Sequence, residues 1–370
     1  MVRVGFVGWR GMVGSVLIDR MGEENDFKRF HSTFFTTSQT GQPAPKIGGD
    51  QEENLQDAHN IDLLSKMDAL VVCQGGDYSS EIYPKLKTAG WQGFWIDAAS
   101  SFRMDEDSII CLDPVNMDII QKGIASGVKK FIGGNCTVSL MLMALGGLFK
   151  ENLIEWLSAT TYQSASGGGA RHMKELITQM HQIGEKATAV LGDKSKGILD
   201  LDANVSTTLQ GTDLNTECFG APLAGNLIPW IDRKMETGQT REEWKAEVEG
   251  NKILQPTIPI PMDGVCVRVG TMRCHSQAFT IKLKQNLSVE EITRIIAEGS
   301  SWVEVIPNEK EETLAKLTPA AVNGTLKIPV GRIRKLSLGD NFISAFSVGD
   351  QLLWGAAEPL RRVLKIILDS

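Results

Sequence analysis

The stretch GFVGWRGMVGSVLIDRM, residues 5–21, decides the fold prediction because it sets three glycines between a short apolar strand and an apolar-periodic helix. These glycines let the backbone approach a pyrophosphate, and the helix offers its unpaired N–H groups and positive dipole end to that group. A tight turn that serves only close packing is the alternative. The position directly after an opening strand favours a dinucleotide site. The residues expected to contact the cofactor here are Gly8, Arg10, Gly11, Met12, Val13 and Gly14.

Strand-like segments recur around this turn and through the first third of the chain, separated by helical or loop stretches. They are RVGFVG, STFFTT, DALVVC, GFWIDAA, SIICLD and KKFIGG. This alternation predicts a parallel, doubly wound, Rossmann-like α/β sheet. From about residue 156 the strands are longer and alternate in polarity, which favours a mostly antiparallel sheet with interspersed helices, an α+β arrangement. After Pro359, apolar residues at helical spacing predict a final helix.

The composition excludes several classes of protein. The chain has 370 residues, enough for two domains, with 42% hydrophobic and 22% charged residues. A net charge of −7 argues against a nucleic-acid surface. The longest apolar run, residues 138–149, is too short to span a bilayer, and the N-terminus shows no signal core. Six cysteines without CxxC pairs or zinc-ligand spacing predict reduced thiols, no metal and a cytoplasmic location.

The end of the second strand indicates which dinucleotide is bound. It reads TTSQ, residues 36–39, where an NAD site usually has an acid for the ribose 2′-hydroxyl. The hydroxyls of Thr37 and Ser38 stand there instead, and Arg10 lies inside the glycine turn. This set would bind a 2′-phosphate, so the sequence predicts NADP.

A cysteine between Asn135 and Thr137, in GGNCTVSLMLM, is the candidate nucleophile. Residues 137–149 are predicted to form a buried helix, with Cys136 at its N-terminus. Unpaired N–H groups at a helix start stabilise a thiolate, so the pattern predicts a lowered thiol pKa. The Asn135 amide can help to hold an oxyanion. A buried, inert core cysteine is the alternative, and the nearby nucleotide domain favours the nucleophile.

Blocks of sequence spread from end to end carry a family resemblance. They are GFVGWRGMVGS, FFTTSQ, CQGGDY, IDAAS, LDPVN, GGNCTVSLMLMALGGLF, NLIPWID, EEWKAE, CVRVG, RCHSQAFTIKLK and VGDQLLWGAAEPLRR. In these blocks the chain resembles bacterial aspartate-β-semialdehyde dehydrogenase. The resemblance implies a fold similar to that of glyceraldehyde-3-phosphate dehydrogenase, with an NADP-binding domain at residues 1–135, a catalytic and dimerisation domain at 136–356, and a helix at 357–370 packing back onto the first domain.

The resemblance also implies an activity. The family is a homodimeric, NADP-dependent phosphorylating aldehyde dehydrogenase that makes aspartate semialdehyde from β-aspartyl phosphate, releasing phosphate. This reaction serves the biosynthesis of lysine (through diaminopimelate), methionine, threonine and isoleucine. A cysteine thioester is reduced by hydride from NADPH, and a histidine passes the proton.

Residue roles follow from the same resemblance. The catalytic set is Cys136 as nucleophile, His275 as acid/base and Gln163 as the residue that orients the substrate. The substrate-binding set is Arg268 for the α-carboxylate, Glu242 for the amine, Arg103 and Lys245 for the phosphate, with Asn135 and Ser100. Gln74, Ser166, Gly167 and Gln351 complete the cofactor set. The chain departs from the family's usual pattern at three glycines after Ser166, which puts that loop's geometry in question, and around Cys218, which receives no role.

Without the resemblance, the sequence pattern favours purely structural roles for some of these residues. Glu242 and Lys245 share a helix face behind a Thr240–Glu243 capping box, and spacing alone favours an exposed ion pair. His275 reads as a surface or satisfied core histidine. In one straight strand, Arg268 and His275 would be ~23 Å apart on opposite faces, so a bend or reversal near Gly270 is required.

Two other functions stay open at this point. One is the related N-acetyl-γ-glutamyl-phosphate reductase chemistry, which an acidic ligand such as Glu242 disfavours because it suits a free amine. The other is a non-catalytic NADP-binding redox sensor that uses Cys136 as its switch, which would not need Arg268, Arg103 and Lys245.

Overall fold

The first sheet, formed by the N-terminal third of the chain, is parallel throughout, as the strand–helix alternation predicted. The computed structural model describes residues 1–370, and the strand order is β3-β2-β1-β4-β5-β7-β6. The strands are β1 (Arg3–Val7), β2 (His31–Thr36), β3 (Gln56–Asp57), β4 (Ala69–Val72), β5 (Phe94–Asp97), β6 (Ser108–Cys111) and β7 (Lys130–Gly133). The helices between them are α1 (Met12–Glu23), η1 (Asp26–Lys28), α2 (Ile61–Leu64), α3 (Gly76–Thr88) and α4 (Asp113–Ala125).

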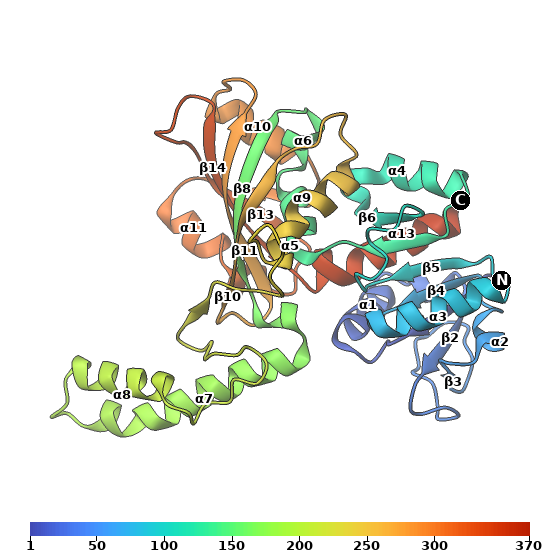
Figure 1. Cartoon of the computed structure of the whole chain (residues 1–370), viewed down its shortest axis with the longest axis horizontal. Helices are drawn as coiled ribbons and strands as arrows, with labels where there is room; N and C mark the ends of the chain where they lie inside the picture. Colours follow the sequence, from blue (N-terminus) through green and yellow to red (C-terminus); the bar gives the residue numbers. More distant parts are fainter.

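The second sheet is mixed and mostly antiparallel, in the order β12-β13-β14-β11-β8-β10-β9. Its strands are β8 (Ile154–Gln163), β9 (Leu227–Ile228), β10 (Met262–Val269), β11 (Cys274–Leu283), β12 (Val303–Val305), β13 (Ile328–Lys335) and β14 (Phe342–Asp350). Its helices are α5 (Cys136–Ala144), α6 (Gly146–Lys150), η2 (Ala165–Gly168), α7 (Ala170–Gly192), α8 (Ile198–Gln210), α9 (Arg241–Leu254), α10 (Val289–Glu298), α11 (Lys310–Lys316) and α12 (Pro319–Val322). The α7–α8 hairpin projects as an arm from the sheets, and the two chain termini lie on the side of the first sheet (Figure 1).

The predicted reversal between Arg268 and His275 is confirmed. β10 ends at Val269 and β11 begins at Cys274, and the two strands lie on either side of β8. β10 runs parallel to β8, with Arg268 opposite Gln163, while β11 runs antiparallel to it. Both side chains are thereby brought to the same end of β8.

The predicted helix over residues 137–149 is wrong in its extent. Helix α5 begins one residue earlier, at Cys136, and ends at Ala144, and α6 follows as a separate helix. The backbone leaves the helical conformation at Leu145, and α6 packs closely on α10, where a Cβ on Gly147 would come within 1.9 Å of the Ile295 carbonyl oxygen. The apolar α5 is buried in the large core under the second sheet.

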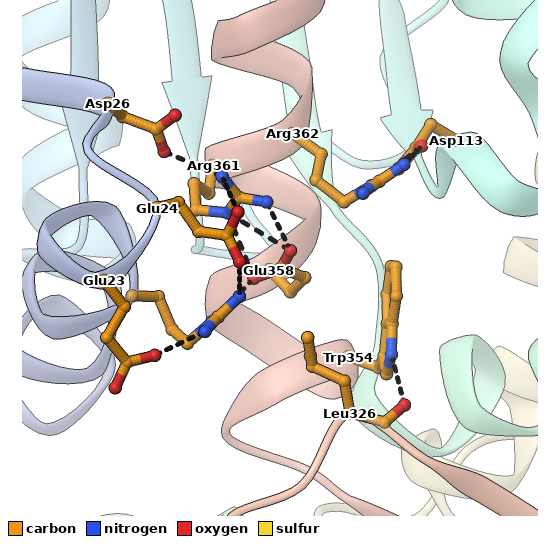
Figure 2. Close-up of polar contacts among 10 residues, drawn as sticks. Glu23, Glu24, Asp26, Asp113, Leu326, Trp354, Glu358, Arg361 and Arg362 are labelled. Carbon is orange, nitrogen blue, oxygen red and sulfur yellow. Dashed lines mark hydrogen bonds and ion pairs between the residues drawn. The ribbon is translucent and has the colours of Figure 1, made fainter. Parts of the chain in front are cut away.

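The C-terminal segment runs from a π-helical turn, η3 (Leu353–Ala357), into helix α13 (Glu358–Asp369), which packs into the core of the first sheet. Ion pairs at the start of α13 fix this packing (Figure 2). Glu358, fully buried, accepts from Arg361 and Arg20; Arg361 also reaches Asp26, and Arg362 pairs with Asp113. The exact domain boundaries, at residues 135 and 356, stay a prediction. None of the helices is long and apolar enough to cross a membrane.

Candidate active site

The glycine turn after β1 has the crowded backbone that a dinucleotide site requires. Gly8 has φ +74°, and a Cβ there would lie 2.4 Å from the Cys73 carbonyl carbon and 2.5 Å from the Gln74 nitrogen. A Cβ at Gly14 would lie 2.3 Å from the Gly8 oxygen. Helix α1 begins at Met12 with no side chain capping its first turn, so its first N–H groups are available to a pyrophosphate. The turn therefore fits the cofactor that its sequence predicted.

The side chains proposed for the 2′-phosphate lie beside this turn. Arg10, Thr37 and Ser38 are all exposed, and Arg10 hydrogen-bonds the Gln39 side chain across the gap between the glycine turn and the end of β2. No carboxylate pairs with Arg10, so its charge stays available to an anion. This arrangement suits a 2′-phosphate better than a bare hydroxyl.

Cys136 and His275 meet as a pair, Sγ to Nε2 at 3.2 Å. The Ser164 N–H donates to His275 Nδ1 at 3.0 Å, and the Ser164 hydroxyl lies at the same distance from that atom. Because Nδ1 accepts, the neutral ring carries its proton on Nε2, facing the sulfur. The histidine is thus set to donate a proton at Nε2.

The predicted lowering of the Cys136 pKa is wrong. Burial and the Glu242 carboxylate raise the pKa of Cys136 to about 12, and burial with the Arg268 charge lowers the pKa of His275 to about 3. The helix start does not compensate, because the Asn135 side-chain oxygen already accepts from the N–H groups of Thr137 and Val138. The resting pair is a neutral thiol and a neutral imidazole.

Glu242 and Lys245, on α9, form a buried ion pair rather than the exposed one that spacing alone favoured. Lys245 Nζ lies 2.8 Å from Glu242 Oε2, and the other carboxylate oxygen accepts from the Asn135 and Gln163 amides. The capping box of Thr240 and Glu243 is confirmed. Burial would raise the pKa of Glu242, but these donors lower it well below its usual range, so it is ionised.

Arg268 is a buried cation without a carboxylate partner. Its side chain is 7% exposed, and it donates one hydrogen bond, from Nη1 to the Ser164 carbonyl at 2.7 Å. Burial lowers the pKa of this guanidinium, but an arginine side chain starts so far above neutral pH that it stays charged. A buried guanidinium without a partner is well suited to bind the carboxylate of a ligand.

Gly167, the first of the three glycines after Ser166, brings the backbone close to these groups. A Cβ at Gly167 would lie 2.9 Å from Arg268 Nη1 and 3.2 Å from His275 Nε2. Gly169 has φ +104°, which only glycine adopts readily. The loop backbone therefore packs directly against Arg268 and His275 at the site. Ser166 accepts from the Gln351 amide at 2.8 Å, which links both predicted cofactor residues.

A single cavity of about 380 Å³ joins most of the predicted catalytic and substrate-binding residues. It is lined by Ser100, Arg103, Asn135, Cys136, Gln163, Gly167, Glu242, Lys245, Arg268 and Gln351, among others. His275 adjoins it through Cys136, and Gly355 of η3 allows close packing there, since a Cβ on it would lie 2.8 Å from the Cys136 Cβ. No group of His, Cys, Asp and Glu side chains is arranged to hold a metal ion.

The sequence reasoning missed three residues of this site. Ser164 fixes the histidine tautomer, as described above. Asp232 lines the cavity, 3.7 Å from Lys245 Nζ. Glu249 is buried between Arg103 and the backbone of Asn135. Only Glu249 had a sequence signal, because it follows Glu242 and Lys245 at helical spacing.

The chain joins a parallel nucleotide-binding sheet to a mixed sheet, and a thiol–imidazole pair lies at a cavity lined by cationic side chains. These features are typical of two-domain dehydrogenases that have a cysteine at the reaction centre. Two family models match: "Semialdehyde dehydrogenase, NAD binding domain" over residues 3–123, and "Semialdehyde dehydrogenase, dimerisation domain" over residues 145–354.

Solved structures agree with this assignment. Aspartate semialdehyde dehydrogenase from Francisella tularensis is 51% identical, covers 99% of this chain and 100% of its own, and has a TM-score of 0.94. The chain belongs to the aspartate semialdehyde dehydrogenase family. Two more distant structures share the fold. Aspartate semialdehyde dehydrogenase II from Vibrio cholerae, complexed with ASA, is 23% identical, covers 100% of this chain and 99% of its own, and has a TM-score of 0.81. Aspartate semialdehyde dehydrogenase with NADP from Candida albicans is 16% identical, covers 100% of this chain and 99% of its own, and has a TM-score of 0.66.

Proposed function

We propose that the chain catalyses the reversible, NADP-dependent conversion of β-aspartyl phosphate to aspartate semialdehyde and phosphate, as a homodimer in the cytoplasm. The supporting observation is the single cavity lined by the Cys136 thiol, with the His275 imidazole directly behind it, by a buried guanidinium without a carboxylate partner, and by a buried, ionised carboxylate. These groups match the acyl carbon, the α-carboxylate and the α-ammonium of one small substrate.

Substrate binding prepares the nucleophile in this proposal. The α-carboxylate pairs with Arg268, and the α-ammonium pairs with Glu242. Since the Glu242 charge is one of the causes that raise the pKa of Cys136, a positive group beside it reduces that repulsion. The thiol then loses its proton more readily, and Gln163 and Asn135 hold Glu242 in place through their amides.

The covalent step uses Cys136 as the nucleophile. Its sulfur attacks the acyl carbon, the bond to the phosphate oxygen breaks, and the thiol proton leaves on the departing phosphate, so that a thioester remains on the sulfur. Arg103 and Lys245 hold the departing phosphate. Bound NADPH supplies the hydride that reduces the thioester. The Nε2–H of His275 donates a hydrogen bond to the oxygen of the tetrahedral species, and the carbon–sulfur bond then breaks to release the aldehyde and the Cys136 thiolate, which takes up a proton from water.

The buried Glu242 carboxylate supports a free amine over an acylated one. An α-ammonium would give this carboxylate a second positive partner beside Lys245, whereas a neutral acetamide would add no ion pair. The same observation disfavours the longer N-acetylated substrate.

The test is the rate of NADPH formation from aspartate semialdehyde and NADP as phosphate is varied. We expect turnover that depends on phosphate and is much slower with N-acetyl-glutamate semialdehyde. A protein that binds NADP but shows no phosphate-dependent turnover would contradict the proposal and favour a redox sensor.

A further inference from the structure

Glu249 is a buried carboxylate that bridges two parts of the site. It lies one turn beyond Lys245 on α9 and is 2% exposed. Its Oε1 accepts from Arg103 Nη1 at 3.1 Å, and its Oε2 accepts from the Asn135 backbone N–H at 2.8 Å. Neither contact comes from its own helix, so both serve to join separate chain segments.

The contact with Arg103 completes a fixed cradle for that guanidinium. Arg103 also donates from Nε to the Gly133 carbonyl at 2.7 Å and from Nη2 to the Gly134 carbonyl at 3.0 Å. A guanidinium has five N–H donors. Three are used by the protein, which leaves one on each terminal nitrogen. Two neighbouring N–H groups form the fork that matches two oxygens of a phosphate.

The contact with Asn135 reaches the nucleophile. Asn135 is the N-cap of α5, and Cys136 is the first residue of that helix. One carboxylate therefore holds both the start of the helix that carries the thiol and the arginine that faces the phosphate. Figure 1 shows α9 and α5 side by side, and they pack against each other.

We propose that Glu249 is a positioning residue that fixes the Arg103 fork relative to Cys136, so that phosphate and the acyl carbon meet in a set geometry. The inference rests on the proposed function, because it concerns the reverse reaction, in which phosphate attacks the thioester. Glu249 itself does not line the cavity. It acts on phosphate through Arg103.

Glu249→Gln is the sharpest variant, because it keeps the size of the side chain and alters only what the two terminal atoms can do. The carboxylate accepts at both positions, whereas an amide has one acceptor and one donor group. In either orientation, one of the two contacts becomes donor against donor. Glu247→Gln is the matched control, since Glu247 lies on the same helix and is exposed.

The measurement is the initial rate against phosphate concentration, with semialdehyde and NADP saturating. We expect Glu249→Gln to raise the KM for phosphate by about tenfold or more, because a charge-assisted hydrogen bond is lost, while the KM for NADP stays within about twofold. Glu247→Gln should match the wild type. In an Arg103→Leu background, Glu249→Gln should add little to the phosphate KM, because both act through one group.

Other outcomes overturn the inference. A lower phosphate KM in Glu249→Gln would mean that the carboxylate only repels phosphate, and equal effects on phosphate and NADP would mean a purely structural role. If the glutamine variant does not fold, Glu249→Asp, which keeps the charge but cannot span both partners, should raise the phosphate KM, and an unchanged curve would refute positioning. Absence of phosphate-dependent turnover in the wild type would instead refute the proposed function.

Discussion

The turn after β1 and the cavity around Cys136 differ in burial, in charge and in the number of chain segments that build them. The turn is one continuous stretch with an exposed Arg10 beside it. The cavity combines residues from both sheets, and its charged groups, apart from the exposed Asp232, are buried and mostly paired. An open site loses little when one contact is removed, whereas a buried network leaves uncompensated charges behind. The largest effects should therefore come from the cavity.

The largest effect is expected at the nucleophile. Cys136→Ser should keep the fold and NADP binding but lose turnover by roughly a thousandfold or more, because a serine hydroxyl is hardly ionised and its ester is a poorer hydride acceptor. Steady-state kinetics and NADP titration measure the two properties. Cys218→Ser, at a half-buried cysteine, is the control. A turnover number for Cys136→Ser equal to that of the wild type would contradict the covalent mechanism.

A smaller but still large effect is expected at Arg268, the proposed binding site for the α-carboxylate. Arg268→Leu should raise the KM for aspartate semialdehyde by about one to two powers of ten, since a charge-assisted, forked contact is lost. Arg268→Lys keeps the charge without the fork and should fall between the leucine variant and the wild type. Initial rates against semialdehyde concentration measure this. Equal KM values in all three proteins would place the α-carboxylate elsewhere.

At the open turn the expected effect is modest. Arg10→Ala should lower the ratio of kcat/KM for NADP to that for NAD by about tenfold, because one exposed contact to the 2′-phosphate is removed. Arg3→Ala, at the opposite end of β1, is a control that should leave the ratio unchanged. If the ratio does not move in Arg10→Ala, Arg10 has no part in cofactor choice.

The smallest effect concerns stability and pH. The pKa of His275 is about 3 in the folded chain, below its ordinary 6.5, so between these values the unfolded chain binds a proton that the folded chain does not. Stability is therefore lost as pH falls below about 6.5, by up to about 1.4 kcal/mol per pH unit from this group. Urea unfolding at pH 6 and pH 5 measures the slope.

The contribution of His275 is isolated by comparison between variants. His275→Gln should show a shallower loss of stability between the two pH values, while His181→Gln, at an exposed histidine, should keep the wild-type slope. Identical slopes in all three proteins would mean that folding does not lower the pKa of His275.

The two regions also differ in what the sequence could predict. The glycine turn, the parallel sheet and the helix start at Cys136 follow from local patterns, and the structure agrees with them. The placing of Arg268 beside His275 does not, because it depends on a reversal over residues 270–273 and on β8 lying between the two strands. The burial of Glu242 with Lys245, and the raised pKa of Cys136, depend on packing between distant segments, which spacing along one helix cannot reveal.

The central claim is that Cys136 carries the acyl group, and mass spectrometry of the trapped intermediate tests it most directly. The protein would be incubated with aspartate semialdehyde and NADP without phosphate, quenched in acid and digested. We predict one acyl group on the peptide that contains Cys136, which disappears when phosphate is added before the quench. No adduct on that peptide, or an adduct on another cysteine that phosphate removes, would contradict the account.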